Sequence, residues 1–161
     1  MNIKLTTLCY LRQDGKYLMI KKKDSDPQAG GKYLGVGGKL EEGESPDECA
    51  KREILEETGF TPLDLKLRGI VTFISDVWDN EIMFLYSAEQ LDGSLRSDCD
   101  EGELSWIEED KVLELPAWEG DKYFLKPLLA GEDDIMIKLN YKGDTLKEAS
   151  RDGAILYCDF T

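Results

Sequence analysis

The strongest local folding signal in this sequence is a helix predicted over residues 45–58. Ser45 is a favourable N-cap residue, Pro46 fits the first helical position, and Glu48 completes a Ser-x-x-Glu capping box. Gly59 stands where a left-handed C-terminal cap belongs. Because both ends of the helix are marked, the side chains that share one of its faces can be identified from their spacing.

Three glutamates share one face of this predicted helix. Glu53, Glu56 and Glu57 lie at positions i, i+3 and i+4, within an arc of about 100°. Like charges at this spacing repel by roughly 0.2–0.5 kcal/mol per pair, so helix formation gives no reason to group them. Two interpretations remain open on the spacing alone. The face is either a solvated acidic surface near Lys51 and Arg52, or a site for a hard divalent cation, which takes oxygen ligands.

A glycine-rich segment before the helix favours the cation site. Gly35, Gly37 and Gly38 let the backbone approach a ligand closely and turn a carbonyl or an amide toward metal or phosphate. Glu44 lies eight residues before Arg52. We expect the Arg52 guanidinium to hold this carboxylate in a bidentate pair and to orient the neighbouring glutamates.

Composition narrows the chemistry further. The 161 residues include 34 acidic and 20 basic side chains, a formal charge of −14, and no histidine. The absence of histidine excludes a Ser-His-Asp triad, a Cys-His pair and any zinc site that needs histidine. A negative field of this size repels nucleic acid polymers and anionic membranes, whereas a small polyanion can bind through bridging cations. Carboxylates or cysteines must therefore carry the chemistry.

Cysteine spacing and hydropathy indicate a cytoplasmic protein. Cys9, Cys49, Cys99 and Cys158 form no CxxC pair, and we expect free, partly buried thiols. No apolar run approaches the ~18 residues that a membrane span needs, and the N-terminus lacks a signal-peptide pattern. We therefore expect a cytoplasmic chain that binds neither nucleic acid polymers nor membranes.

The remaining secondary-structure signals predict a mixed α/β fold. Strands are expected at 3–11 and 17–22, joined by a turn at Asp14-Gly15, and at 66–75, 81–88 and near 104–107. We expect a loop at 24–32, a turn at 91–94, a short helix at 121–129, and two tail strands at 134–141 and 154–160 separated by polar residues. Strands outnumber helices and do not alternate with them regularly, which favours a mixed sheet packed by few helices.

Residues 38–60 carry a resemblance to a known family. They read GKLEEGESPDECAKREILEETGF and match the pattern G-x5-E-x7-R-E-U-x-E-E-x-G-U, where U is a bulky apolar residue. The matching positions are Gly38, Glu44, Arg52, Glu53, Ile54, Glu56, Glu57, Gly59 and Phe60. On this segment the chain resembles the Nudix hydrolases, enzymes that split a nucleoside diphosphate linked to another moiety. The resemblance implies a single Nudix domain over 1–161, with a mixed β-sheet sandwiched between helices, the Nudix box at 38–60 and a C-terminal β-like extension at 131–161.

The resemblance also implies metal ligands and catalytic residues. The implied ligands are the Gly37 carbonyl and the carboxylates of Glu53, Glu56, Glu57 and Glu101. The implied metal is Mg²⁺, with Mn²⁺ as a substitute, and the ions would neutralise phosphate oxygens and acidify a bound water. Glu53 or Glu56 would be the general base, a choice that the sequence leaves open. Arg52, paired with Glu44, would orient these groups.

The likeness extends to the MutT-like subgroup, which hydrolyses oxidised purine nucleoside triphosphates. Residues 115–121 resemble a base-reading segment in which Trp118 stacks on the purine and Asp121 bonds its edge, although Trp118 also fits a core or lid position. The other residues implied to line the substrate are Thr7, Lys22, Leu34 and Gly38. Leu34 stands where some relatives carry Asn, and Gly120 where they carry a second acid. Weak discrimination between oxidised and normal guanine is therefore expected. Core packing is expected for Trp106.

These observations predict a Mg²⁺-dependent hydrolase that acts on a small nucleotide as a monomer or homodimer. The expected reaction converts a nucleoside triphosphate such as 8-oxo-dGTP to the monophosphate and pyrophosphate, and so cleans the nucleotide pool. ADP-ribose or a nucleotide sugar is the rival substrate class, but the proline that such relatives place after the box is absent from 74–78. A Nudix-like module that binds nucleotides without cleaving them is the alternative from another class. Such modules usually lose box carboxylates, whereas this box is intact.

Overall fold

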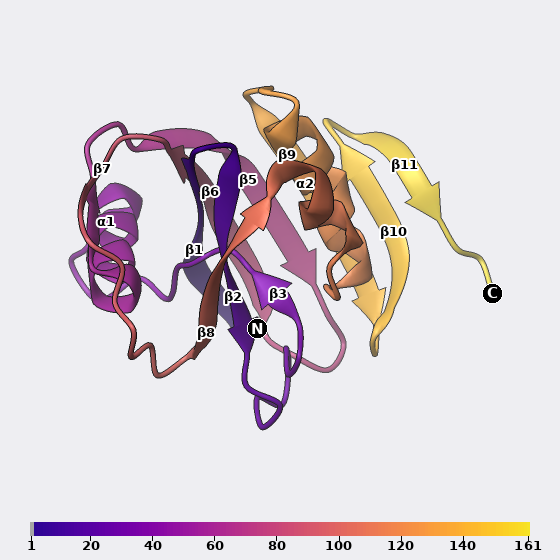
Figure 1. The fold of residues 1–161 in the computed structure, drawn as a ribbon. Coiled ribbons are helices and arrows are strands. Elements are labelled where there is room, and N and C mark those ends of the chain that lie inside the picture. The colour runs from indigo at the N-terminus through magenta and orange to yellow at the C-terminus, as the bar shows by residue number, and fades with distance from the viewer. Residues whose placement is uncertain (1) are drawn as a thin grey trace.

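A computed structural model describes residues 2–161 and shows one large mixed sheet with a helix on each face (Figure 1). The strands of this sheet are β1 (Ile3–Gln13), β2 (Lys16–Lys22), β3 (Tyr33–Leu34), β5 (Lys66–Ile74), β6 (Asn80–Ala88), β8 (Gly102–Glu108), β9 (Ile135–Lys142), β10 (Thr145–Arg151) and β11 (Ala154–Cys158). A separate pair consists of β4 (Phe60–Pro62) and β7 (Leu91–Gly93). The α-helices are α1 (Pro46–Thr58) and α2 (Lys122–Leu129), and two 3₁₀ helices are η1 (Glu109–Glu114) and η2 (Glu119–Asp121).

The strand order of the large sheet is β11-β10-β9-β5-β6-β1-β2-β3, and β8 also pairs with β2. The β1–β6 and β5–β9 pairs are parallel, while the other pairs are antiparallel. This arrangement confirms the expected mixed α/β sheet with few helices. The tail joins the same sheet, because β9 pairs with β5 along six residues, from Gly69↔Ile135 to Ile74↔Asn140.

The core has two layers, one on each face of the sheet. Successive side chains of a strand point to opposite faces. Tyr10 of β1 therefore packs in the cluster that includes Phe124 of α2, whereas Leu11 packs in the cluster that includes Ile54 of α1. All four side chains are almost fully buried, and each contributes about 1.5–3 kcal/mol through the apolar surface it removes from water. The two helices thus cover the two faces, as Figure 1 shows.

Helix α1 begins and ends as the sequence predicts. The Ser45 hydroxyl accepts a hydrogen bond from the Glu48 N–H at 3.2 Å, and the Glu48 carboxylate accepts one from the Ser45 N–H at 3.1 Å. At the other end, Gly59 adopts φ 85° and donates its N–H to the Leu55 carbonyl at 2.9 Å. The caps fix where the helix begins and ends, and the burial of Ala50 and Ile54 fixes which of its faces meets the sheet.

The structure differs from the sequence expectations in the tail and at 91–94, and it adds a short strand after the loop at 24–32. The polar stretch of the tail contains a third strand, β10, whose Leu146 and Ala149 are buried and pack in the α2-side cluster. The expected turn at 91–94 includes strand β7, because it pairs with 60–62 directly after α1. The expected loop at 24–32 is present, and the two-residue strand β3 that follows it pairs with β2. In each case a partner distant in the sequence decides the local conformation.

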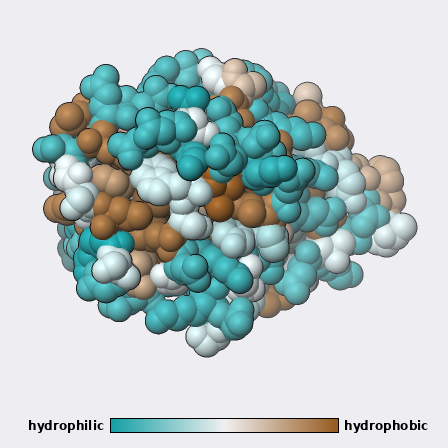
Figure 2. Space-filling model, viewed as in Figure 1, coloured by the Kyte–Doolittle hydropathy of each residue, from teal (hydrophilic) through white to brown (hydrophobic). Residues whose placement is uncertain are grey.

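The cysteines and the surface agree with the expectations from composition. All four cysteines are free; Cys9 and Cys49 are buried, while Cys99 and Cys158 are half-buried. The face shown in Figure 2 is mostly hydrophilic, with separate hydrophobic patches. Among residues 2–161, no helix combines the length and apolar character needed to cross a membrane.

Candidate active site

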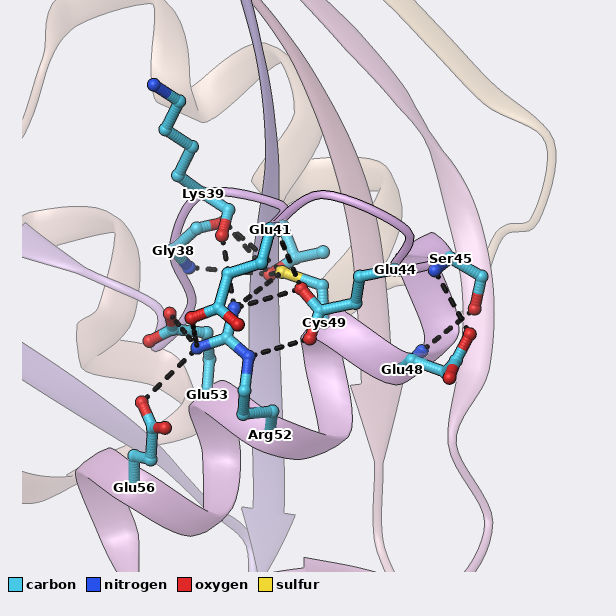
Figure 3. Close-up of polar contacts among 11 residues, drawn as sticks. Gly38, Lys39, Glu41, Glu44, Ser45, Glu48, Cys49, Arg52, Glu53 and Glu56 are labelled. Atoms are coloured by element: carbon cyan, nitrogen blue, oxygen red, sulfur yellow. Dashed lines mark hydrogen bonds and ion pairs between the residues drawn. The ribbon is translucent and has the colours of Figure 1, made fainter.

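Arg52 lies at the centre of a group of carboxylates on helix α1 and the loop before it (Figure 3). Its Nε and Nη2 donate to the two carboxylate oxygens of Glu44 at 2.7 and 3.0 Å, so the expected bidentate pair is present. Its Nη1 reaches Glu53 Oε1 at 2.8 Å and Glu56 Oε2 at 3.3 Å. The Arg52 bond, followed by the Glu41 N–H, lowers the pKa of Glu44 to about 2. One guanidinium thus orients three carboxylates.

The glycine loop lies directly against this group. A Cβ on Gly37 would overlap the carbonyl oxygen of Thr7, and a Cβ on Gly38 would lie 2.5–2.8 Å from the carboxylate atoms of Glu53. The backbone therefore excludes a side chain at Gly37, whereas one at Gly38 would force the Glu53 carboxylate to move. The Gly37 N–H donates to Glu57 Oε2 at 3.3 Å. Two glutamates of α1 consequently pack on the backbone of the loop.

Glu57 is the buried acid of this group, with 8% of its surface exposed. Burial, followed by repulsion from Glu53, raises the pKa of Glu57 to about 8, while the Gly37 N–H and Lys22 oppose the rise. A buried carboxylate beside a second carboxylate is poorly stabilised by its surroundings. A bound cation would reverse this penalty and favour the ionised form.

The residues present fit a hard divalent cation. The donors are carboxylates and backbone carbonyls, which Mg²⁺ and similar ions prefer. Over residues 2–161, however, no three Cys, Asp or Glu side chains converge closely enough to hold a metal ion. The reason lies in the ion pairs. Arg52 binds Glu53 and Glu56, and the Glu56 side chain is 59% exposed. Glu101, 58% exposed at its side chain, pairs instead with Lys22 at 3.4 Å.

A cavity of about 330 Å³ lies next to the loop. One part of its lining, here named the loop wall, consists of Thr7, Lys22, Gly37 and Gly38. Another part, the aromatic wall, consists of Leu34, Phe73, Met83, Trp118 and Asp121. The structure therefore brings together in one cavity the six residues that the sequence assigns to substrate binding: Thr7, Lys22, Leu34, Gly38, Trp118 and Asp121.

Trp118 belongs both to the core and to the cavity. Its ring is 8% exposed and makes edge contacts with Phe73 and Tyr141, with centroids 5.6 and 4.9 Å away. The Lys32 ammonium lies 5.2 Å from its centroid, within the range of a cation–π contact. The two interpretations of Trp118 from the sequence are therefore compatible. Trp106, by contrast, packs against Phe60 in the α1-side cluster, which confirms its expected core position.

Asp121 is a buried acid in the aromatic wall. Burial raises its pKa to about 7, and the positive charge of Lys32 opposes the rise. Its Oδ2 is buried, and no group among residues 2–161 forms a hydrogen bond with it. A buried oxygen without a partner is costly. Because this residue lines the cavity, a ligand can supply the missing bond.

Several residues of the cavity were not identified from the sequence, and three of them lie side by side on the sheet. Phe73, Glu81 and Met83 come from β5 and β6. The alternation of apolar residues in these strands indicates that Glu81 and Met83 share a face. It does not indicate which face borders a cavity, because that depends on where the segment 115–121 folds back.

Comparison with known proteins agrees with this geometry. The NUDIX domain family matches residues 3–128. The chain is 33% identical over 130 residues to the Nudix hydrolase YvcI of Bacillus subtilis (strain 168), which covers 78% of this chain and 79% of that protein. It is 32% identical over 120 residues to the oxidized purine nucleoside triphosphate hydrolase of Danio rerio, covering 73% and 74%.

Solved structures extend the likeness to the tail. The crystal structure of a MutT protein from Bacillus halodurans superposes with a TM-score of 0.83 and 32% identity, covering 92% of this chain and 97% of that one. Family, fold and the intact box of carboxylates therefore agree. The chain belongs to the NUDIX domain family and is an enzyme, a Nudix hydrolase of the MutT-like type.

Proposed function

We propose that this enzyme hydrolyses an oxidised purine nucleoside triphosphate, such as 8-oxo-dGTP, to the monophosphate and pyrophosphate. The observation that carries the proposal is the shared cavity: the loop wall and the unpartnered Asp121 of the aromatic wall line one space. A cavity with an aromatic ring at one wall and lysine and glycine at another suits a base linked to phosphates. The similarity to oxidized purine nucleoside triphosphate hydrolases of fish and mouse supports the same substrate class.

We propose Mg²⁺ as the metal, with Mn²⁺ as a substitute. The residues that would hold it are the Gly37 carbonyl and the carboxylates of Glu53, Glu56, Glu57 and Glu101. When bound, such an ion neutralises phosphate charge and lowers the pKa of the attacking water. Support comes from the oxygen donors beside the glycine loop and from the buried, repelled carboxylate of Glu57.

The chain's own residues position the reacting groups. Arg52 holds Glu53 and Glu56 on one side and Glu44 on the other. Glu53 and Glu56 would turn from Arg52 toward a bound metal, while Glu44 keeps the guanidinium in place. Glu53 or Glu56 takes the proton of the attacking water. Lys22 of the loop wall lies within reach of acidic partners and supplies positive charge toward the phosphates.

The aromatic wall binds the base in this proposal. Trp118 stacks on the purine, and Asp121 forms a hydrogen bond with its edge. Because the pKa of Asp121 is about 7, its protonated form can donate and its ionised form can accept near neutral pH. Leu34 offers no hydrogen bond, so the enzyme discriminates weakly between oxidised and normal guanine.

The tail supports the base-binding segment. The Tyr141 hydroxyl of β9 accepts a hydrogen bond from the Gly120 N–H at 2.6 Å, and its ring contacts Trp118. We therefore propose that the extension 131–161 positions residues 118–121 and that 1–161 works as one domain, as a monomer or homodimer. The family match, which ends at residue 128, does not include this strand.

A substrate panel tests the proposal. The enzyme is assayed with Mg²⁺ on 8-oxo-dGTP, dGTP, dATP and ADP-ribose, and pyrophosphate and phosphate release are measured separately. We expect turnover of the triphosphates with one pyrophosphate per monophosphate and loss of turnover with EDTA. ADP-ribose as the best substrate would place the enzyme in the rival substrate class. Nucleotide binding without turnover would make it a binding module. Glu57→Gln serves as the control for contaminating phosphatases.

A further inference from the structure

A carboxylate on the sheet borders the cavity and has no part in the function described above. Glu81 of β6 lies opposite Lys4 of β1 and opposite Phe73 of β5. Directly paired residues of neighbouring strands point to the same face. The side chain of Glu81 therefore stands beside Phe73, whose ring contacts that of Trp118, and it lines the same cavity as Asp121.

The fold gives this carboxylate little support. The Thr6 hydroxyl donates to Glu81 Oε2 at 3.1 Å. Within the described range 2–161, this is the one hydrogen bond to the carboxylate, and no Lys or Arg nitrogen lies within 4.0 Å of it. Burial raises the pKa of Glu81, while the Thr6 hydrogen bond and the positive charge of Lys4 oppose the rise. An apolar side chain would suit the neighbours Phe73 and Met83 better, so packing does not account for the acid.

The neighbouring loop has no space for a second acid. Gly120 precedes Asp121, and a Cβ there would lie 2.7 Å from the Tyr141 hydroxyl and 2.9 Å from Leu139 Cδ1. A side chain at this position would have to displace the side chains of Tyr141 and Leu139. Position 120 therefore has no room for an acid next to Asp121, whereas Glu81 of the sheet lines the same cavity.

The neighbours of Glu81 indicate how a nucleotide would lie. Lys4, Lys22 and Lys39 all line the cavity and attract phosphates, and Lys4 is paired with Glu81 on the sheet. Glu81 is also paired with Phe73, whose ring contacts Trp118, so it lies on the side of the cavity assigned to the nucleoside, whereas Lys22 belongs to the loop wall. An ionised carboxylate only accepts hydrogen bonds. Its partner on the nucleoside must be an N–H or O–H donor.

We propose that Glu81 determines specificity by accepting a hydrogen bond from an N–H or O–H donor on the nucleoside half of the substrate. The inference rests on the proposed nucleoside triphosphate substrate and names a contact within it. The donor has two sources: the exocyclic 2-amino group of a guanine base, or the 3′-hydroxyl of the sugar. Thr6 holds the carboxylate for this contact and is a positioning residue.

The test compares parent enzyme and Glu81→Gln on dGTP, on dITP, which lacks the 2-amino group, and on ddGTP, which lacks the 3′-hydroxyl. Hydrogen bonds to charged groups are strong, so we expect Glu81→Gln to lower kcat/KM for dGTP by roughly 10-fold or more. The loss appears chiefly in KM. On the analogue that lacks the donor, Glu81→Gln lowers kcat/KM by less than about threefold. That analogue is dITP if the base supplies the donor and ddGTP if the sugar supplies it.

Two further variants act as controls. Asp79→Asn removes a charge that acts on Glu81 without altering the lining of the cavity, and we expect kcat/KM within twofold of the parent. Thr6→Val keeps the Glu81 carboxylate but removes its hydrogen bond from Thr6. We expect a smaller loss of kcat/KM than for Glu81→Gln, with the same difference between dGTP and the analogue. Thermal unfolding of each variant separates lost contacts from lost folding.

An equal loss on all three substrates, or no loss on any, overturns the role of Glu81. Binding measured with Ca²⁺ in place of Mg²⁺ gives dissociation constants for the same series and does not depend on turnover. If the parent hydrolyses none of the triphosphates, the proposed function fails. The dissociation constants then still show whether Glu81→Gln weakens the binding of nucleotides that carry the donor and leaves the binding of the analogue without it unchanged.

Discussion

The two walls of the cavity are built in opposite ways. Behind the loop wall, the carboxylates around Arg52 are already paired by the protein: Arg52 binds Glu44, Glu53 and Glu56 through hydrogen bonds of 2.7–3.3 Å. On the aromatic wall, Asp121 keeps a buried oxygen without a partner within the described chain. The polar groups around Arg52 are thus bonded to one another, whereas the aromatic wall keeps one carboxylate oxygen available to a ligand.

From this difference we expect the carboxylates around Arg52 to set the rate and the aromatic wall to set substrate preference. A network that is complete before binding positions the reacting groups for every substrate equally. A buried group without a partner raises the affinity for a ligand that can bond to it and lowers the affinity for a ligand that cannot. Changes around Arg52 should therefore alter the rate for all substrates, whereas changes on the aromatic wall should alter preference among them.

The largest expected effect is that of Glu57→Gln on the rate. The change removes a proposed metal ligand together with its charge, so kcat should fall at least ~10²-fold on every substrate. Because the carboxylate is buried and repelled by Glu53, unfolding temperature should stay equal or rise. Glu42→Gln, an exposed acid of the loop before α1, is the matched control. Near-normal kcat at saturating Mg²⁺ would show that Glu57 holds no metal.

Arg52→Lys should reduce kcat roughly 10- to 100-fold, because an ammonium cannot form the bidentate pair with Glu44 and reach Glu53 as well. Because the charge is unchanged, a large loss of kcat would show that the geometry of the guanidinium is what matters. Lys51→Arg, at the exposed neighbouring position, controls for a general effect of exchanging these residues. Activity within twofold of the parent would mean that the network does not position the carboxylates.

Trp118→Ala should act on the aromatic wall through KM. Base–aromatic stacking contributes about 1–3 kcal/mol, and the lower part of that range applies because Phe73 and Tyr141 already cover part of the ring. We expect kcat/KM to fall roughly 5- to 30-fold, unequally among substrates. Removing a buried Trp also destabilises the fold. Assays below the unfolding temperature, with Trp118→Phe alongside, separate the effects; an unchanged KM on every substrate would refute stacking.

The smallest expected effect is a dependence of stability on pH through Asp121. Burial raises its pKa to about 7 in the folded state, above the usual value of 3.8. The folded state therefore binds the proton more tightly, and the resulting stability is complete below pH 3.8 and declines as pH rises toward 7. The slope is at most about 1.4 kcal/mol per pH unit.

Asp121→Asn should remove this slope. Denaturant unfolding of parent and variant between pH 5 and 8 measures it, since the free energy difference should move in favour of the variant as pH rises. Parallel curves for the two proteins would mean that Asp121 titrates in the folded state as it does in the unfolded chain.

The same contrast explains what could be predicted from the sequence. Helix α1 and the Arg52–Glu44 pair depend on caps and spacings within one segment, and both are present as expected. The aromatic wall depends on contacts between distant segments. Strand alternation places Glu81 and Met83 on one face, but only the return of residues 115–121 over that face makes it a cavity wall.

Strand β10 illustrates the same limit within the fold. Its sequence, TLKEASR, is largely polar, and the sequence predicts only polar residues between the two tail strands here. It forms a strand because β9 and β11 pair with it on both sides and because Leu146 and Ala149 meet the α2-side cluster. Backbone pairing with neighbours outweighs a weak local preference in such a segment.

The division of duties between the two walls is tested most directly by one ratio. The kcat/KM for 8-oxo-dGTP divided by that for dATP is measured for the parent, Arg52→Lys and Trp118→Ala. We expect Arg52→Lys to lower both values by the same factor, so that the ratio stays within about twofold of the parent, and Trp118→Ala to shift the ratio by more. A ratio that changes with Arg52→Lys and not with Trp118→Ala would contradict the account.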